Sequence, residues 1–153
     1  MGIETVLIVI GDEGNERAET LARVAAEEAA SSNAEVVVGY TFSEDGFAEA
    51  VQRFGFDRST DQLSPGDVAD RIGPVQAAHD YLDEERIDAS VHAEIGHGGP
   101  EMFVEMADRL GVDRVVVGGE RRSPAGKAVF GSDAQTILLD STCPVVYVGG
   151  DVA

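Results

Sequence analysis

The stretch 118–132 combines glycines with basic side chains and is the part of this sequence best suited to bind a charged small molecule. It follows an apolar run, leads into a helical pattern and contains Arg121, Arg122 and Lys127. Backbone N–H groups at the start of a helix carry partial positive charge and suit a phosphate. Because acidic residues dominate the chain, with 29 Asp and Glu against 11 Lys and Arg, this basic cluster is not expected from composition. The stretch therefore predicts a site for a small anion.

The same residues can also be explained without a ligand. Ser132 followed by Gln135 fits a capping box, which stabilises a helix start by about 1 kcal/mol. Asp133 in the first turn would already balance the helix dipole and would repel a phosphate. Both interpretations remain open from these residues alone.

Strand and helix patterns alternate along the chain, and this alternation indicates an α/β fold. Unbroken apolar runs predict parallel strands covered on both faces, and helical spacing of apolar residues predicts the helices between them. The expected strands are Thr5–Ile10, Glu35–Thr41, Ser90–Ile95, Arg114–Gly118 and Pro144–Val148. The expected helices lie around Ala18–Ala29, from Pro74 to Leu82, after Gly99-Pro100 as far as Leu110, and from Gly131-Ser132 through Leu138.

The predicted architecture is a five-stranded, mainly parallel, doubly wound sheet with helices on both faces. The third strand is polar enough to lie near an edge. The segment 43–73 is less regular, and we expect a partly helical insertion there, with Phe47, Val51 and Phe54 on one helix face and a turn at Ser64-Pro65-Gly66-Asp67. The length predicts one domain, residues 1–153.

The charge balance excludes several classes of partner. A formal net charge of −18 and a pI near 4.2 disfavour nucleic acid and anionic membranes, and no apolar run is long enough for a membrane span. The acidic excess, with Lys127 as the single lysine, is typical of proteins from salt-loving organisms. Cys143 is the single cysteine, so no internal disulfide can form and we expect a cytoplasmic protein.

The remaining polar residues do not form a catalytic or metal-binding pattern. His79, His92 and His97 lack the spacing of a metal site, and we expect surface or hydrogen-bonded histidines. Cys143 precedes an expected buried strand, which favours a packed thiol over a nucleophile. We therefore expect no catalytic residues, no metal and no flavin.

The chain resembles the universal stress protein (UspA) family in the stretch described first. That family carries Gly, two residues, Gly, nine residues and then Gly-Ser or Gly-Thr after its fourth strand; Gly118 and Gly131-Ser132 fit this pattern. Thr5–Ile10, Val112–Gly118 and Ser141–Val148 resemble the first, fourth and closing strands of the family, whereas 43–73 matches nothing we can name. The resemblance implies a Rossmann-like fold of the adenine nucleotide alpha hydrolase type and a non-catalytic stress-response protein. It also implies ATP or another adenine nucleotide as ligand and a homodimer through Pro144–Val148, which would cover a sheet edge.

Two departures from the family pattern concern the nucleotide site. Arg121 stands where the family has its second glycine, so its side chain either fills the phosphate space or contacts the anion. Gly11 stands where ATP-binding members have an Asp at the end of the first strand, and Asp12 follows one residue late. By resemblance, adenine would lie near Val9, Gly11 and the backbone of Thr41. The expected site residues are Val9, Gly11, Asp12, Thr41, Val117, Gly118, Gly119, Arg121, Gly131, Ser132 and Asp133.

Two other functions compete with this interpretation. Gly14-Asn15-Glu16 faintly resembles the phosphate loop of flavodoxin, although hydroxyl side chains are missing there and the chain has no Trp. A weak nucleotide hydrolase would need a metal-bound triphosphate, for which Asp12 and Asp133 could hold a cation, but nothing would orient the attacking water.

Overall fold

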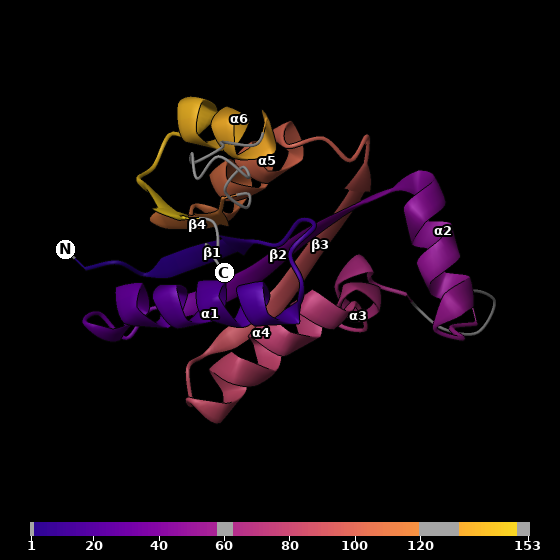
Figure 1. Cartoon of the computed structure of the whole chain (residues 1–153), viewed down its shortest axis with the longest axis horizontal. Coiled ribbons are helices and arrows are strands. Elements are labelled where there is room, and N and C mark those ends of the chain that lie inside the picture. The colour runs from indigo at the N-terminus through magenta and orange to yellow at the C-terminus, as the bar shows by residue number, and fades with distance from the viewer. Residues whose placement is uncertain (1, 58–62, 120–131, 150–153) are drawn as a thin grey trace, which may run out of the picture.

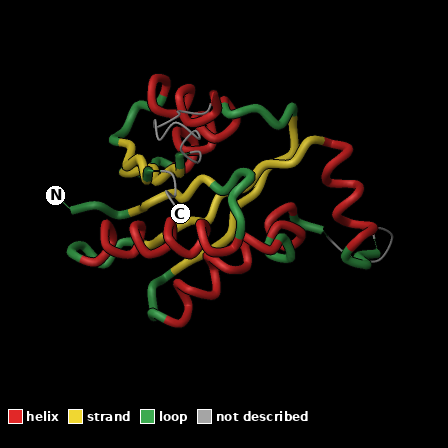
Figure 2. Tube along the Cα trace, in the orientation of Figure 1, coloured by secondary structure: helices red, strands yellow, loops and turns green. Residues whose placement is uncertain are grey.

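The structure is a computed structural model that describes residues 2–57, 63–119 and 132–149. Strands and helices alternate along the chain, as the sequence predicts (Figure 2). The strands are β1 (Thr5–Val9), β2 (Glu35–Ser43), β3 (Ala89–Gly96), β4 (Arg114–Gly118) and β5 (Val145–Val148). The helices are α1 (Asn15–Ala30), α2 (Glu44–Arg53), α3 (Pro65–Ala69), α4 (Gly73–Glu84), α5 (Glu101–Leu110) and α6 (Ser132–Asp140).

The five strands form one sheet in the order β3-β2-β1-β4-β5, and every pairing is parallel. The predicted fold class is confirmed, and β3 lies at an edge as its polarity indicated. The chain runs from β1 outward to β2 and β3, and then returns to the other side of β1 to form β4 and β5. The strand order therefore reverses between β1 and β4, which is where α/β sheets of this kind bind ligands.

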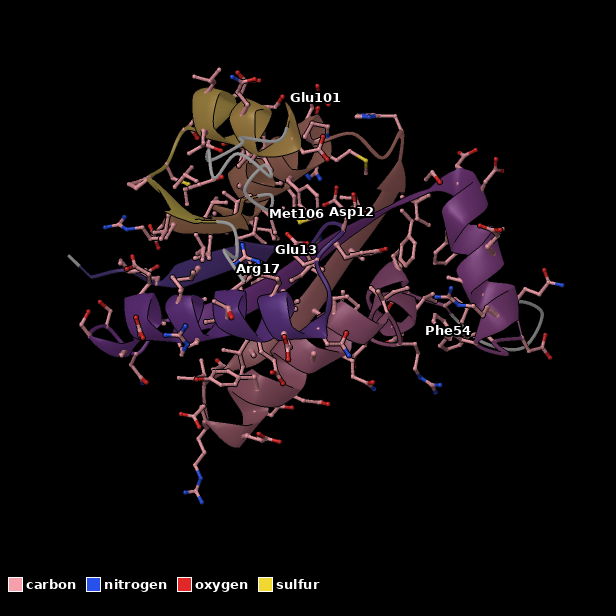
Figure 3. All side chains as sticks on the ribbon, in the orientation of Figure 1. Asp12, Glu13, Arg17, Phe54, Glu101 and Met106 are labelled. Carbon is pink, nitrogen blue, oxygen red and sulfur yellow. The ribbon has the colours of Figure 1, made fainter. Side chains whose placement is uncertain are left out.

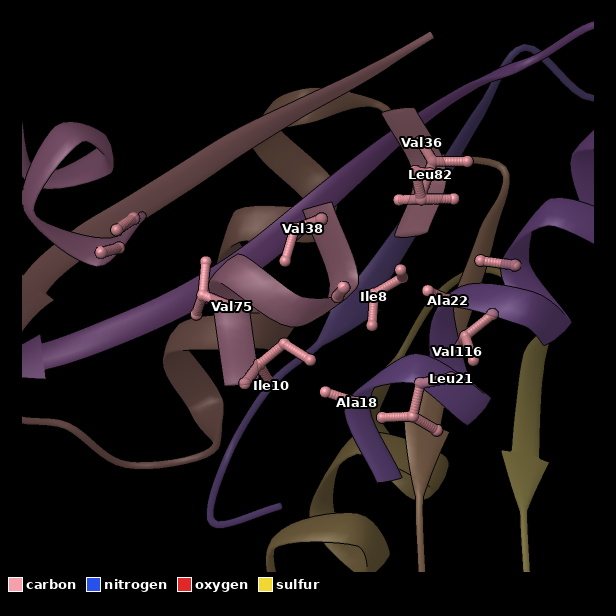
Figure 4. Close-up of a cluster of buried hydrophobic side chains, with 14 of the residues drawn as sticks. Ile8, Ile10, Ala18, Leu21, Ala22, Val36, Val38, Val75, Leu82 and Val116 are labelled. Atoms are coloured by element: carbon pink, nitrogen blue, oxygen red, sulfur yellow. The ribbon is translucent and has the colours of Figure 1, made fainter. Parts of the chain in front are cut away.

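Alternate residues of β1 enter two separate cores because successive side chains of a strand point to opposite faces. Val6 and Ile8 pack with α1 and α4 on one face, and Leu7 and Val9 pack with α5 and α6 on the other. Figure 1 shows these two helical layers on either side of the sheet, and Figure 4 shows the first core. None of the helices in the described ranges is long and apolar enough to cross a membrane.

A glycine in the middle of β2 lets α5 approach the sheet closely. A Cβ at Gly39 would lie 2.8 Å from Leu7 Cδ1 and 3.2 Å from the sulfur of Met106. Met106 is fully buried, so its thioether fills the space that a larger residue at Gly39 would need. The ligand end of the sheet is thereby held against α5.

The insertion 43–73 is partly helical, as predicted. The Ser43 hydroxyl accepts a hydrogen bond from the Gly46 N–H at 3.0 Å and caps α2. The segment Ser64-Pro65-Gly66-Asp67 was predicted as a turn, and this is wrong in part: it begins the short helix α3. Ser64 accepts from the Asp67 N–H at 3.1 Å, and Pro65 occupies a first-turn position where its missing N–H costs nothing.

Candidate functional site

The candidate site lies at the carboxyl ends of β1 and β4. Val9 pairs with Val117 across these strands, and both side chains are buried in the core beneath α5 and α6. They form the floor of the site. Gly11 and Asp12 follow β1, and Gly118 and Gly119 complete β4 and begin the next loop. The structure thus brings together these six of the predicted site residues.

Glu13 turns back over the end of β1. Its Oε2 accepts a hydrogen bond from the Gly11 N–H at 2.6 Å. Its Oε1 lies 3.4 Å from the position that a Cβ on Gly118 would occupy. A half-buried carboxyl group therefore lies over the ends of the two paired strands.

Burial raises the pKa of the Glu13 carboxyl group above its usual value. The nearby charge of Asp12 acts in the same direction, whereas the N–H groups of Glu13 and Gly11 and the charge of Arg17 act against it. The ionised form is therefore less favourable here than in water.

Arg17 connects the first helix to the last two strands. Its Nη2 donates to the carbonyl oxygen of Gly119 at 3.2 Å and to that of Val148 at 3.3 Å. The Gly119 N–H also donates to the Val148 carbonyl at 2.7 Å. Figure 3 shows Asp12, Glu13 and Arg17 close to one another, in the loop after β1 and the first turn of α1. Because a Cβ on Gly118 would lie 3.2 Å from Arg17 Nη2, glycine suits this position.

The backbone of Thr41 extends past the end of β1. The β1–β2 pairing ends at Val9 and Gly39, where the Gly39 carbonyl accepts from the Ile10 N–H at 3.0 Å. In a parallel strand, the N–H and C=O of one residue point to the same side and alternate residues point to the same neighbour. The N–H and C=O of Thr41 therefore point toward the side of β2 on which β1 lies. The β1–β2 pairing ends before Thr41, so no β1 residue pairs with them.

A cavity of about 270 Å³ adjoins Thr41 at the end of β2. Its wall combines the Tyr40 ring with the charged side chains of Glu49 and Arg53 and the apolar side chain of Ile72. Burial raises the pKa of Tyr40, and the Asp12 charge adds to this effect, while Arg53 opposes it. Arg53 also lies over the Phe54 ring, 4.5 Å from its centre. The cavity is just below the usual size of a small-molecule site.

The rest of the predicted site falls partly outside the described residues. Arg121, Gly131 and the Ser132 side chain lie there, so their predicted roles stay predictions. Asp133 is exposed in the first turn of α6. Sequence reasoning missed Glu13 as a site residue, and it missed Arg17. One signal for Arg17 was available: a basic residue in the first turn of a helix opposes the helix dipole, which indicates another partner.

Two of the histidines lie beside carboxylates, and the single cysteine is a partly buried free thiol. His79 Nδ1 lies 3.0 Å from Asp70 Oδ1, and His92 Nε2 lies 2.9 Å from Glu94 Oε2. Within the part of the chain that the structure describes, no three potential ligands group around a common point. Burial raises the pKa of the Cys143 thiol, as expected of a packed thiol and not of an activated nucleophile.

The profile of the Universal stress protein family matches residues 3–149, and the chain belongs to this family. A protein named "Universal stress protein" from Mycolicibacterium smegmatis is 29% identical over 126 residues, which cover 74% of this chain and 95% of that protein. The family assignment made from Gly118, Gly131-Ser132 and the strand pattern is confirmed. Neither the flavodoxin-like nor the hydrolase alternative is favoured by these matches.

Solved structures of the same family share the fold. A universal stress protein from Archaeoglobus fulgidus superposes with a TM-score of 0.66 at 24% identity, covering 95% of this chain and 98% of that one. The structure from that organism in complex with dAMP gives 0.67 at 20% identity, covering 97% and 99%. A universal stress protein in complex with cAMP gives 0.58 at 21% identity, covering 99% and 100%.

Proposed function

We propose that this chain is a non-catalytic stress-response protein that binds an adenine nucleotide at the carboxyl ends of β1, β2 and β4. The single observation that carries the proposal is the backbone of Thr41, which faces the switch point beyond the end of β1. The dAMP and cAMP complexes of family members support the choice of ligand.

The Thr41 backbone has the chemistry to recognise adenine. Adenine places an amino donor beside a ring nitrogen acceptor on one edge. A backbone C=O and N–H that point the same way supply the matching acceptor and donor. The base would then lie over Val9 and Gly11, next to the cavity that Tyr40 and Arg53 line. Recognition through main-chain atoms does not require a particular side chain at position 41.

The test removes the Thr41 N–H without removing a sheet hydrogen bond. Pairing of β2 with β3 uses the alternate residues, as the 2.8 Å bond from the Val36 N–H to the Asp88 carbonyl shows. Thr41→Pro should therefore keep the fold and weaken binding of AMP at least tenfold in calorimetric titrations at molar KCl. Thr41→Val is the matched control, because it keeps the main chain and should bind within threefold of wild type. Equal affinity of Thr41→Pro and Thr41→Val would contradict the proposal.

The phosphate side of the proposed site comprises Gly118, Gly119, Arg121, Gly131, Ser132 and Asp133. The titration with Arg121→Gly separates the two roles that the sequence allows for Arg121. If the variant binds the nucleotide and wild type does not, the Arg121 side chain fills the phosphate space. If the variant binds more weakly than wild type, Arg121 contacts the anion. Release of phosphate from a nucleotide, at a rate that rises with protein concentration, would contradict a non-catalytic role.

The proposal includes the setting of the protein. We treat residues 1–153 as one domain. The net charge of −18 supports a salt-adapted cell, and the single cysteine supports the cytoplasm. We also assign it a homodimer through β5, one of the two edge strands of the described sheet. All four β5 residues are partly exposed, and Leu139 on the neighbouring α6 is 77% exposed.

A further inference from the structure

Glu13 places a carboxyl group over the carboxyl ends of β1 and β4. Glu13 Oε2 is fixed by the Gly11 N–H at 2.6 Å, and Glu13 Oε1 faces Gly118. We propose that Glu13 determines the specificity of the site: its carboxylate admits the hydroxyl groups of a nucleoside or nucleoside monophosphate and rejects a polyphosphate chain. This inference rests on the proposed function and narrows the ligand class.

The first step is electrostatic. A polyphosphate laid over Gly118 would bring its oxygens against Glu13 Oε1, and two negative groups this close, partly shielded from solvent, repel each other strongly. Asp12, in the same loop, adds to the negative potential at Glu13. Glu13 therefore disfavours the ligand group that the adjacent glycine would otherwise admit.

The second step is that the nearest described cation does not cancel this charge. Arg17 lies near Glu13, but no ion pair joins the two side chains in the described residues, because the guanidinium is turned toward the strand ends. The Arg17 Nη2 donates to the carbonyl oxygens of Gly119 and Val148. Its hydrogen bonds thus tie down the ends of β4 and β5, and a phosphate would have to compete for them. The groups that face Glu13 in the described residues are Asp12 from its own loop, Arg17 from α1 and the uncharged Gly118 from β4.

The third step concerns the groups that the site accepts. A carboxylate in a poorly hydrated place is stabilised by hydrogen-bond donors. The ribose of a nucleoside carries hydroxyl groups that can donate to Glu13, whereas phosphate oxygens at neutral pH only accept. A short ligand can place its ribose hydroxyl groups at Glu13 and keep a single phosphate away from Oε1. The site geometry therefore favours adenosine and AMP over ATP.

The experiment compares wild type with Glu13→Gln, which keeps the size of the side chain and removes its charge. Glu16→Gln is the matched control, since Glu16 is exposed in the first turn of α1 and loses the same charge. Each protein is titrated with adenosine, AMP and ATP at molar KCl and pH 7.5. Wild type should bind adenosine at least tenfold more tightly than ATP. Glu13→Gln should shift this ratio at least tenfold toward ATP, and Glu16→Gln should stay within threefold of wild type. A ratio in Glu13→Gln within threefold of wild type would overturn the inference.

A ligand without a base separates failure of this inference from failure of the proposed function. If no protein binds any of the three adenine compounds, the proposed function fails. Tripolyphosphate then tests Glu13 alone: it should raise the unfolding temperature of Glu13→Gln and leave that of wild type and Glu16→Gln unchanged. Equal responses of all three proteins would overturn the role of Glu13. Glu13→Asp retains the charge and shortens the side chain, so it should prefer adenosine over ATP less strongly than wild type; an unchanged preference would count against the role of Oε1.

Discussion

Asp113 accepts a hydrogen bond from the backbone N–H of Thr5 at 3.1 Å, which ties the start of β4 to the start of β1. The same Oδ2 atom accepts a second bond from the Glu4 N–H at 2.8 Å. These are the two strands whose opposite ends frame the candidate site. A side chain far from the ligand end thus helps to align both strands. The two N–H donors lower the pKa of Asp113 below its ordinary value of 3.8.

Asp113→Asn should destabilise the fold in a pH-dependent way. Because the pKa is lower in the folded state, ionised Asp113 contributes stability above pH 3.8, and this contribution disappears as the pH falls through the lower folded value. Wild type should therefore be more stable than Asp113→Asn at pH 6, with a difference that shrinks below pH 3.8. Denaturant unfolding at molar KCl measures this difference. Asp80→Asn, an exposed change on α4, is the control. A difference that does not vary with pH would contradict the role given to Asp113.

Arg17→Gln should lower the free energy of unfolding by about 1.5–3 kcal/mol, the range for hydrogen bonds that involve a charged group. The variant loses the donor that joins α1 to the Gly119 and Val148 carbonyls. Arg23→Gln is the matched control on the same helix. Arg23 is 56% exposed and lies 3.8 Å from Glu27, so its loss should cost less than about 0.5 kcal/mol. Equal costs for the two variants in urea unfolding would refute the link between α1 and the strand ends.

The arrangement of the fold could be predicted from the sequence because the strands are buried on both faces. The apolar runs at Thr5–Ile10 and Arg114–Gly118 have no alternation, which is the pattern of parallel strands covered on both faces. The observed order places β1 and β4 side by side at the switch point. The polar third strand was expected near an edge and lies at one. Residues that are neighbours in the sequence therefore suffice to indicate which segments form buried strands and which strand lies at an edge.

The candidate site was harder to predict because the contacts of its charged side chains form only in the folded chain. Gly118 and Thr41 were found from the family pattern. Glu13 lies in the loop between β1 and α1, and nothing in the local sequence shows that its side chain folds back to the Gly11 N–H. The partners of Arg17 lie more than a hundred residues further along the chain, at Gly119 and Val148. Contacts of this kind depend on the strand order and not on residue spacing.

Thermal stability should rise with salt concentration. The described residues contain only a few Arg–carboxylate pairs, such as Arg109–Glu94 and Arg114–Glu28, so most of the negative charge is balanced by solvent ions alone. Salt screens that repulsion, with a Debye length of about 10 Å at 0.1 M and about 3 Å at 1 M. The unfolding midpoint should therefore rise by several degrees, on the order of 5 °C, between 0.1 M and 2 M KCl. The double variant Glu84→Gln/Glu85→Gln should depend less on salt. A midpoint that does not move with KCl would contradict this prediction.

The dimer proposed through β5 can be tested at single hydrogen bonds. The carbonyl oxygens of Pro144 and Val148 accept hydrogen bonds from the N–H groups of Val115 in β4 and of Gly119 just after it. The main-chain N–H and C=O groups of the even-numbered residues therefore point toward β4. The N–H group of Val145 then points away from β4, where a second copy would pair with it.

Val145→Pro removes one outward N–H and leaves the pairing with β4 intact, which an edge strand tolerates. Light scattering at molar KCl should give a dimer for wild type and a monomer for Val145→Pro. Val146→Lys places a charge within the strand and should give monomer or aggregate. Ile95→Lys is the control: Ile95 is 39% exposed on β3, the opposite edge strand, and the variant should remain dimeric. A monodisperse wild-type monomer would eliminate the β5 dimer, and a dimeric Val145→Pro would move the interface to another surface.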